Sequence, residues 1–356
     1  MHHEQYIQRC LELSLLGKGR VSPNPMVGAV LVFEGRIIGE GWHKEYGGPH
    51  AEVNCLASVK EEDKHLIPHS TMYVSLEPCA HYGKTPPCAN RLVQEQVKEV
   101  IICNTDPNDK VDGKGINILK QAGIHVTTGI LEAEGRWINR RFFSMQERKR
   151  PYVILKWAQS ADGCIAPLDR SRYQLSTPHS QQLVHKWRTE EDAIMVGYTT
   201  ALNDDPQLTA RLWKGKNPLR IVVDKNLQIP TTHKLYDDEA ETWVLNSSKS
   251  GREDNVEYVQ LDFNENIIPQ LLDKLYSADK QSLIVEGGAK LLESFISAGL
   301  WDEARVFATE AKLSNGIPAP KLQDGVLAEQ TPVGSDVLHL YINKNNPYPF
   351  MPGYEL

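Results

Sequence analysis

Two stretches of the sequence, GGPHAEV at residues 47–53 and LEPCAHYGKTPPC at residues 76–88, decide how the first half of the chain is interpreted. His50 lies at the start of a predicted helix, Cys79 follows a predicted strand, and Cys88 opens the next predicted helix. One imidazole and two thiolates are the ligand set of a catalytic zinc ion that keeps a fourth position open. The sequence therefore predicts a Zn²⁺ site built from His50, Cys79 and Cys88.

Glu52 lies two residues after His50 and is not needed as a ligand. At the start of a helix this spacing can turn its carboxylate towards a metal-bound water, where it can accept a proton and pass it to a leaving amine. Two thiolates and a neutral imidazole balance Zn²⁺, so the pKa of the bound water can fall to about 7, which provides hydroxide at neutral pH. This combination is the zinc deaminase pattern, although eight residues separate Cys79 from Cys88 here where that pattern has two.

Other interpretations of this pattern are weaker. A loop histidine with two cysteines buried as small apolar residues would require three ligands and a glutamate to coincide by chance at the ends of elements. A purely structural zinc ion would need a fourth ligand from the protein. The nearby histidines do not have a suitable spacing for that ligand; they are His43, His65, His69 and His81.

The length of the chain predicts two domains, because 356 residues exceed what one hydrophobic core usually organises. The first half alternates helix and strand patterns, which predicts helices packed on both faces of a mixed sheet. Its predicted strands are residues 26–32, 36–41, 71–76, 100–103 and 124–128, and its predicted helices are an N-terminal amphipathic helix and residues 50–60, 89–97 and 131–147.

A charged run that ends in proline, at residues 146–151, marks the predicted domain boundary. We therefore predict one domain at residues 1–147, a second at residues 148–342, and a proline-rich tail at residues 343–356 that is extended or disordered. The second domain is also α/β, with predicted strands at residues 152–156, 193–197, 220–224, 242–245, 256–261, 282–286, 305–308 and 337–342.

The composition is that of an ordinary globular protein and excludes several classes of function. The net charge of −7 argues against nucleic acid as a partner, because that affinity depends on many contacts from Lys and Arg to phosphates. No apolar run approaches the roughly 20 residues that cross a bilayer, and residues 1–19 lack the apolar core of a signal peptide. We therefore expect a cytoplasmic protein with no membrane partner, whose six cysteines form no disulfide framework. A homo-oligomer is compatible with the sequence.

Two patterns in the second half indicate further candidate sites. The strand, Gly-Gly turn and helix at residues 284–292 would suit a dinucleotide pyrophosphate, and they would equally form an ordinary tight turn. The segment lacks the full Gly-x-Gly-x-x-Gly pattern, so a Rossmann domain is not indicated. Arg188 and Arg211 are candidates for binding a substrate phosphate, since guanidinium groups match phosphate oxygens, and Lys156 at the end of a strand could reach a polar cleft.

The chain also resembles a known family over nearly its whole length. SPNPMVG at residues 22–28, HAEV at residues 50–53, the segment 76–88 with its long insert, and KWAQSADG at residues 156–163 resemble the bifunctional riboflavin-biosynthesis deaminase–reductase family. The Gly-Lys-Thr-Pro-Pro insert separates this family from the cytidine, guanine and tRNA-adenosine deaminases. The resemblance implies a three-layer α/β/α cytidine-deaminase-like domain, followed by a dihydrofolate-reductase-like α/β domain.

The resemblance further implies a function for each domain. The first would hydrolytically deaminate 2,5-diamino-6-(ribosylamino)-4(3H)-pyrimidinone 5′-phosphate at zinc, and the second would use NADPH to reduce the ribosyl side chain to ribityl. His50, Cys79 and Cys88 would hold the zinc ion, with Glu52 as proton carrier, and Lys156 and Asp204 would lie near the hydride-transfer centre. The implied cofactor contacts are Ala158, Gln174, Thr200, Asp204, Gly288, Ala289, Lys290, Leu291, Leu292 and Glu293. The implied substrate contacts are Asn24, His43, His81, Lys84, Arg172, Arg188, Leu208, Arg211 and Glu286.

Some of these residues have alternatives. Asn24 can pair with a pyrimidine edge or simply form a turn between two prolines, and His43 can equally be a structural histidine. Gln174 stands where the family usually has tryptophan, and residues 308–320 also depart from the family pattern. Loss of the aromatic side chain at residue 174 would weaken the packing of NADPH, unless Tyr173 takes its place.

Two functions of other classes compete with this interpretation. A nucleic-acid base deaminase with a C-terminal RNA-binding domain is disfavoured by the acidic balance and by the absence of a basic, aromatic-rich strand pattern. A non-catalytic sensor would keep zinc and dinucleotide but lose turnover. Glu52 counts against a sensor in the first half, whereas Gln174 leaves it open for the second.

Overall fold

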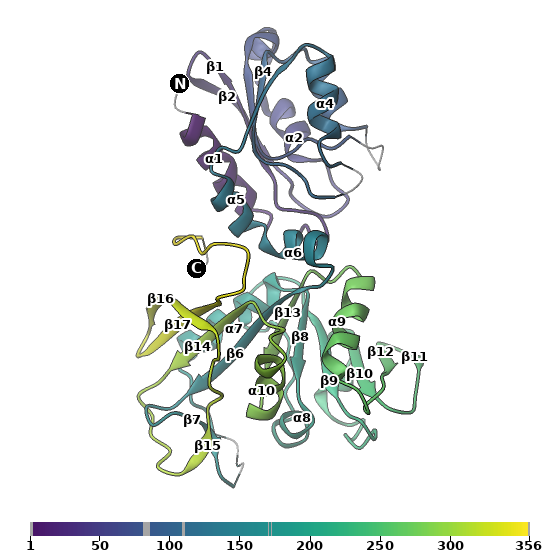
Figure 1. The fold of residues 1–356 in the computed structure, drawn as a ribbon, viewed down its shortest axis with the longest axis vertical. Helices are drawn as coiled ribbons and strands as arrows, with labels where there is room; N and C mark the ends of the chain where they lie inside the picture. Colours follow the sequence, from purple (N-terminus) through teal and green to yellow (C-terminus); the bar gives the residue numbers. More distant parts are fainter. Residues whose placement is uncertain (1–2, 81–85, 109–110, 170, 172, 355–356) are drawn as a thin grey trace. The chain divides into compact units, whose positions relative to one another are not determined.

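The computed structural model describes residues 3–80, 86–108, 111–169, 171 and 173–354 (Figure 1). The chain divides into two compact units, Met1–Arg148 with Met351–Leu356, and Lys149–Phe350. Each unit is built around a large sheet of its own. Within the described residues, no helix combines the length and the apolar character that crossing a bilayer would require.

The first unit contains a mixed sheet in the order β2 (Arg36–Trp42), β1 (Gly28–Phe33), β3 (Thr71–Leu76), β4 (Glu99–Asn104) and β5 (His125–Thr128). β1 is antiparallel to both of its neighbours, whereas β3, β4 and β5 run parallel. The helices of this unit are α1 (His3–Leu15), α2 (Ala51–Ser58), α3 (Cys88–Gln94), α4 (Lys114–Gln121), α5 (Glu132–Ile138) and α6 (Arg140–Arg148), with a 3₁₀ helix at Glu61–His69.

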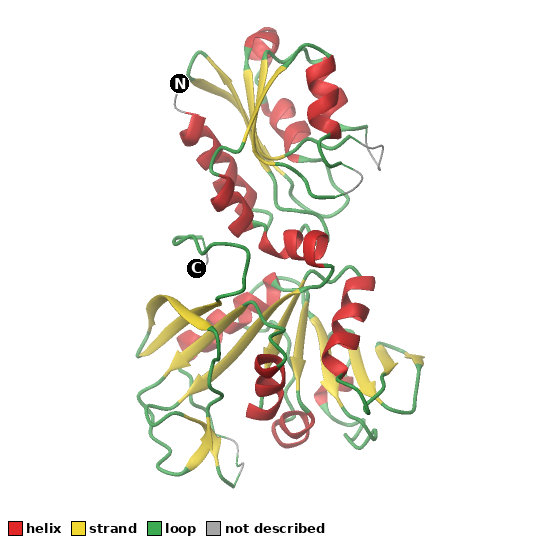
Figure 2. Ribbon diagram, in the orientation of Figure 1, coloured by secondary structure: helices red, strands yellow, loops and turns green. Residues whose placement is uncertain are grey.

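Apolar residues on both faces of this sheet explain its layers. Because side chains alternate along a strand, Ile102 of β4 joins one hydrophobic cluster with residues of α2, α3 and α4. Its neighbour Ile101 joins a second cluster with residues of α1 and with Ile138 of α5. Figure 2 shows helices on both sides of the strands. The predicted α/β/α layering is confirmed.

The single helix predicted at residues 131–147 is wrong, because Asn139 divides it into α5 and α6. The Asn139 side chain donates from Nδ2 to the Met26 carbonyl and accepts at Oδ1 from the Met26 N–H, both at 2.8 Å. Asparagine favours helix ends because its side chain bonds backbone groups in this way. The break fixes the segment before β1, which carries Asn24.

The second unit contains a larger sheet in the order β11 (Gly251–Glu253), β12 (Val256–Gln260), β10 (Thr242–Asn246), β9 (Leu219–Val223), β8 (Ala193–Val196), β13 (Ser282–Glu286), β6 (Tyr152–Gln159), β14 (Glu303–Ala308), β17 (Asp336–Asn343) and β16 (Gly325–Val333). The strands from β12 to β14 run parallel, and β11, β17 and β16 are antiparallel additions. The helices are α7 (Pro178–Glu190), α8 (Tyr198–Asp204), α9 (Ile267–Ser277) and α10 (Ala289–Ser297), with a 3₁₀ helix at Lys234–Tyr236. β7 (Cys164–Pro167) and β15 (Gly316–Pro318) pair separately.

Every strand predicted in the second half is present, but the sequence does not predict β7, β11, β15 or β16. The longest of these is β16. This strand lies at the edge of the sheet, and its side chains do not alternate cleanly between buried and exposed. Val326 and Leu327 are both exposed, and Pro332 lies within the strand. Edge strands tolerate proline and need no apolar face, so they leave a weak signal in the sequence.

The first part of the C-terminal tail is packed against the second unit. Tyr348 is fully buried. Asn346 donates from Nδ2 to the hydroxyl of Tyr152 at 3.0 Å. Of the two alternatives predicted for the tail, the disordered one is wrong for these residues, because a buried tyrosine and specific hydrogen bonds hold them in place.

The last described residues of the tail belong to the first unit. The Tyr354 hydroxyl donates to Gln8 Oε1 of α1 at 2.9 Å. Its ring packs against the hydrophobic cluster that contains Ile7 and Leu11. The chain therefore contributes to the first unit from both of its ends.

A buried ion pair anchors the start of the second unit. Arg150 donates to the two carboxylate oxygens of Asp302 at 2.6 and 2.8 Å, and the Val153 N–H donates to the same carboxylate at 2.8 Å. The Asp302 side chain is 1% exposed. Asp302→Ala would leave the Arg150 charge buried without its carboxylate, so we expect it to lower the free energy of unfolding by about 3–5 kcal/mol.

Urea unfolding of the purified protein measures this loss, with Glu241→Ala as the control. Glu241 pairs with Arg252 on the surface of the same unit at 3.1 Å, and both side chains are more than a third exposed. Exposed pairs contribute at most about 1 kcal/mol, so the control should change stability little. Equal losses in the two variants would contradict the importance of the buried pair.

Candidate active sites

The first unit brings together the three predicted zinc ligands from three segments. His50 is the N-cap of α2, Cys79 follows β3, and Cys88 is the first residue of α3. His50 Nδ1 lies 3.5 Å from Cys79 Sγ and 3.4 Å from Cys88 Sγ, and the three ligand atoms lie within 4.8 Å of one another. Tetrahedral zinc, with bonds of about 2.0 Å to nitrogen and about 2.3 Å to sulfur, would separate nitrogen and sulfur by about 3.5 Å. The donor set therefore fits zinc in chemistry and in spacing.

The surroundings of Cys79 favour its thiolate form. The pKa of Cys79 is lowered to about 4, chiefly because the Cys88 thiol donates to it, and His50 and the Cys88 backbone N–H also donate. That N–H lies 3.3 Å from the Cys79 sulfur. The pKa of Cys88 is raised in turn, because it shares the proton with Cys79 and is buried. A metal ion in place of the shared proton would leave both sulfurs as thiolates.

Glu52 lies in the first turn of α2 beside this cluster and is only 3% exposed. Burial raises the pKa of Glu52 to about 7, although the neighbouring His50 opposes the change. A carboxyl group with a pKa near neutrality can both accept and donate a proton at physiological pH. The position of Glu52 thus suits proton transfer next to the predicted metal.

Asn24 and His43 lie next to the ligand cluster. His43 Nδ1 lies 3.1 Å from the Pro49 carbonyl, and His43 Nε2 lies 3.0 Å from Asn24 Nδ2. Because a carbonyl can only accept, Nδ1 donates to it and the neutral ring accepts from Asn24 at Nε2. Burial lowers the pKa of His43, which keeps the ring neutral. The His43 and His50 ring centroids are 5.4 Å apart.

The sequence analysis did not assign Glu77, which supports the segment leading to Cys79. The buried Glu77 carboxylate accepts from the backbone N–H groups of Asp106 at 3.3 Å, Gly113 at 3.1 Å and Ile116 at 3.2 Å. A carboxylate that binds three backbone groups of another loop fixes both segments. An acidic residue directly after an apolar strand was the only signal for this role.

In the second unit, three predicted residues form a charged cluster. Glu286 ends β13, and its Oε2 accepts from Arg188 at 3.1 Å and lies 3.8 Å from Lys156 Nζ. Burial by itself would raise the pKa of Glu286, but Arg188 and Lys156 outweigh it and hold the pKa below its usual value. Burial lowers the pKa of Lys156. In the described part of the chain, Glu286 Oε1 is buried and has no hydrogen-bond partner.

Arg211 and Leu208 lie on the segment that follows α8. Arg188 donates from Nη1 to the Thr209 carbonyl at 3.1 Å, which links this segment to the charged cluster. The backbone N–H of Arg211 donates to His185 Nδ1 at 2.9 Å. The sequence analysis missed His185, although its spacing of three residues from Arg188 on α7 places both on one helix face. Leu208 is buried, with 3% exposure.

Thr200 and Gly288, two of the predicted cofactor residues, are in contact. The Gly288 N–H donates to Thr200 Oγ1 at 3.1 Å. Gly288 is the N-cap of α10, and Gly287 before it has a φ of +127°, which favours glycine. The other predicted residues of this turn form the beginning of α10: Ala289, Lys290, Leu291, Leu292 and Glu293. The free backbone N–H groups at such a helix start can bind a phosphate.

The remaining predicted residues are dispersed. Ala158 lies on β6 opposite Phe307, and Asp204 is the last residue of α8. Gln174 is exposed and donates to Ser176 Oγ at 2.9 Å. Three predicted substrate residues lie outside the described residues: His81, Lys84 and Arg172.

Comparison with known proteins also divides the chain into two parts, much like the two compact units of the structure. Residues 1–104 match the cytidine and deoxycytidylate deaminase zinc-binding region, and residues 151–309 match the RibD C-terminal domain. The chain is 37% identical over 322 residues to riboflavin biosynthesis protein RibD of Aquifex aeolicus, which covers 88% of each sequence. The chain belongs to the RibD family. RibD of Escherichia coli K12 is 33% identical, with 86% of this chain and 87% of the relative covered.

Solved structures agree with this membership. The diaminohydroxyphosphoribosylaminopyrimidine deaminase/5-amino-6-(5-phosphoribosylamino)uracil reductase of Thermotoga maritima is 32% identical, with a TM-score of 0.88 and coverage of 96% of this chain and 98% of that one. RibD of Acinetobacter baumannii gives a TM-score of 0.87 at 32% identity with the same coverage.

The predicted family, fold class and cofactors are therefore confirmed. As a RibD protein, the chain combines a zinc-dependent deaminase with an NADPH-dependent reductase. A nucleic-acid base deaminase with an RNA-binding half is not favoured, because the second half matches the RibD C-terminal domain.

Proposed function

We propose that this RibD protein catalyses two consecutive steps of riboflavin biosynthesis on one small pyrimidine. It first deaminates 2,5-diamino-6-(ribosylamino)-4(3H)-pyrimidinone 5′-phosphate and then reduces the ribosyl side chain to ribityl. The observation that supports the proposal is the presence of two different clusters of polar side chains in one chain. One is the His50, Cys79 and Cys88 cluster beside Glu52, and the other is the Glu286 cluster.

In the proposed deamination, His50, Cys79 and Cys88 hold zinc, which when bound supplies Lewis-acid activation of water. Glu52 accepts the proton that the attacking water loses and delivers it to the amino group, which leaves as ammonia. Its pKa of about 7 suits both transfers, because neither protonation state is strongly favoured at neutral pH.

Asn24 and His43 position the pyrimidine in this proposal. Their hydrogen bond of 3.0 Å fixes which way the Asn24 amide points, so its polar edge is oriented before substrate arrives. Asn139 supports the same segment through its paired hydrogen bonds to Met26. A preoriented amide loses little freedom on binding, which favours recognition of the aminopyrimidine edge.

In the proposed reduction, NADPH, when bound, would supply a hydride to C1′ of the ribosyl group, while the C1′–O4′ bond breaks and O4′ takes up a proton to become a hydroxyl. Thr200, Gly288 and the start of α10 hold the cofactor, with Ala158 and Gln174 as further contacts, and Lys156 and Asp204 lie near the transfer centre. Glu286 Oε1 has no hydrogen-bond partner among the described residues. In this proposal it accepts a hydrogen bond from a hydroxyl or N–H group of the substrate. Arg188, Leu208 and Arg211 complete the substrate site.

The domain boundaries and the wider setting are also part of the proposal. Residues 1–147 form the deaminase domain, residues 148–342 form the reductase domain, and residues 343–356 form a C-terminal tail. The partner is a small-molecule pyrimidine, and neither nucleic acid nor a membrane is a partner. The net charge of −7 argues against nucleic acid. We place the enzyme in the cytoplasm, and a homo-oligomer is compatible with this function.

A coupled assay with metal analysis tests this function. With the diaminopyrimidine phosphate and NADPH, zinc-loaded protein should release ammonia and then oxidise about one NADPH per ammonia, because each substrate passes through both reactions. Omitting the diaminopyrimidine should abolish NADPH oxidation. Ammonia release without any NADPH oxidation, even with the deaminated compound supplied directly, would reject the reductase assignment and favour a cofactor-binding sensor in the second half.

A further inference from the structure

Arg211 is held by uncharged groups. Its Nη1 donates to Gln207 Oε1 and to Thr209 Oγ1, each at 2.9 Å, and its backbone N–H donates to His185 Nδ1 at 2.9 Å. No carboxylate of the described residues lies within ion-pair distance of Arg211, whereas the nearby Arg188 is paired with Glu286 at 3.1 Å. The Arg211 charge is therefore oriented without being neutralised.

The ring of His185 stays neutral in this arrangement. Burial lowers the pKa of His185 to about 4, and the charges of Arg188 and Arg211 act in the same direction. A neutral ring presents Nδ1 as an acceptor to the Arg211 backbone N–H. Two neutral acceptors thus hold the Arg211 guanidinium, and a third holds the backbone of the same residue.

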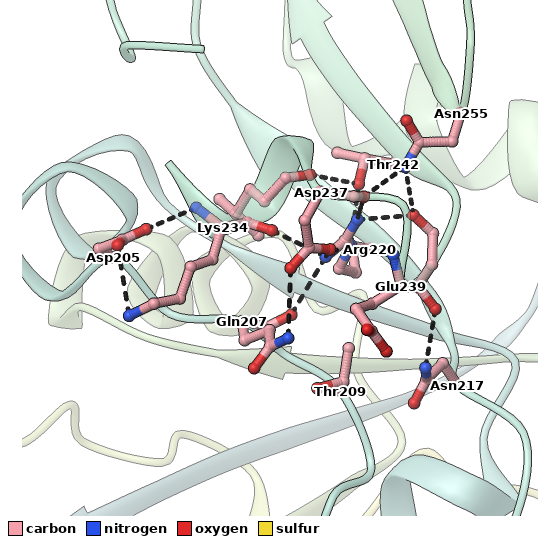
Figure 3. A network of polar contacts seen from close by, with 12 residues as sticks. Asp205, Gln207, Thr209, Asn217, Arg220, Lys234, Asp237, Glu239, Thr242 and Asn255 are labelled. Atoms are coloured by element: carbon pink, nitrogen blue, oxygen red, sulfur yellow. Dashed lines mark hydrogen bonds and ion pairs between the residues drawn. The ribbon is translucent and has the colours of Figure 1, made fainter. Parts of the chain in front are cut away.

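On its other side, Gln207 is held by a partly buried network (Figure 3). Its Nε2 donates to Asp237 Oδ2 at 3.2 Å, and Asp237 Oδ1 accepts from Arg220 Nη1 at 2.7 Å. Arg220 is fully buried in β9. Arg220 also donates to Thr242 Oγ1 at 2.9 Å and to the carbonyls of Gln207, Lys234, Asp237 and Ala240 at 2.6–3.4 Å. The Gln207 amide is therefore held at both ends, between Asp237 and Arg211.

We propose that Gln207 is a positioning residue that aims the Arg211 guanidinium at the phosphate of the reductase substrate. This inference rests on the proposed function, in which Arg211 contacts the substrate. Gln207 occupies only Nη1, so Nη2 and Nε of Arg211 can bind two oxygens of a phosphate as a fork. The amide suits this position because its oxygen accepts from Arg211 while its nitrogen donates to Asp237. A carboxylate here would repel Asp237 and would compete with the phosphate for Arg211.

The test compares Gln207→Leu and Gln207→Glu with the wild-type full-length enzyme. The reductase substrate is supplied directly, with and without its 5′-phosphate. For the phosphorylated compound we expect Gln207→Leu to raise KM about tenfold, as expected for losing a hydrogen bond to a charged group, and to change kcat less than about twofold. Gln207→Glu should raise this KM further. For the compound without phosphate, both variants should match the wild type.

Three controls make the outcome decisive. Gln260→Leu makes the same change at an exposed position of β12 and should leave all parameters unchanged. Ammonia release reports an intact deaminase unit in every variant. Arg211→Met tests the underlying function: if it leaves the KM for the phosphorylated compound unchanged, the proposed phosphate contact itself fails. If Arg211→Met raises that KM and neither Gln207 variant does, or if the Gln207 variants raise KM equally for both compounds, the positioning role is rejected.

Discussion

The Glu52→Gln enzyme is expected to keep its zinc and to deaminate about 10²–10⁴ times more slowly than the wild type. Glutamine preserves the size of the side chain but cannot take up the proton from water. In the wild type, burial raises the pKa of Glu52 to about 7, so its carboxyl exchanges protons readily near neutral pH. Elemental analysis measures the zinc, and ammonia release measures the rate.

Two controls separate this effect from a general loss of structure. Glu62→Gln makes the same change at an exposed position of the same unit, where the side chain is 77% exposed, and should leave deamination unchanged. NADPH oxidation with the deaminated compound should also be normal in Glu52→Gln, because the reductase residues lie in the other unit. Ammonia release at a near-normal rate would remove Glu52 from the mechanism.

Cys88→Ala is expected to abolish stoichiometric zinc binding and, with it, measurable deamination. Losing a residue that only supports a metal ligand typically costs 10–100-fold in affinity, so loss of a ligand should cost more than about 100-fold. The remaining pair, His50 and Cys79, would offer too few protein ligands to hold zinc tightly. Zinc per chain, determined after dialysis without chelator, measures the effect.

Cys103→Ala is the matched control for this variant. Cys103 is a fully buried cysteine of the same unit, but its sulfur donates to the Leu131 carbonyl at 3.0 Å and lies outside the ligand cluster. It should therefore retain zinc and deamination. Full zinc occupancy in Cys88→Ala, or equal loss in the two variants, would contradict the assigned ligand set.

The deaminase site was predictable because its residues can be recognised from the local sequence. His50, Cys79 and Cys88 stand at the ends of elements that the apolar pattern defines well, and few other chemistries use this combination of residues. The sequence also predicts most strands of both sheets, because these strands are buried and apolar. Asn139 escaped prediction because the cause of the helix break is its pairing with Met26, which is remote in the sequence.

The reductase site was less predictable because its geometry is assembled from many segments. The sequence predicts Arg188 and Arg211 as candidate phosphate-binding cations. It does not reveal that Glu286 pairs with Arg188, or that uncharged groups hold Arg211. Gln207 has no signature of its own, because its role depends on Asp237, thirty residues away. Such contacts follow from tertiary structure and leave no periodic pattern in the chain.

The return of Tyr354 to Gln8 has a practical consequence for anyone who wishes to separate the two activities. The reductase unit, Lys149–Phe350, is one continuous segment, but the deaminase unit is not. A fragment that stops at Arg148 lacks the segment Met351–Leu356, and a fragment that runs from Lys149 to the last residue carries that segment without its binding surface. Splitting the polypeptide cleanly would require a cut on either side of the reductase, or transplantation of the final residues onto the shorter fragment.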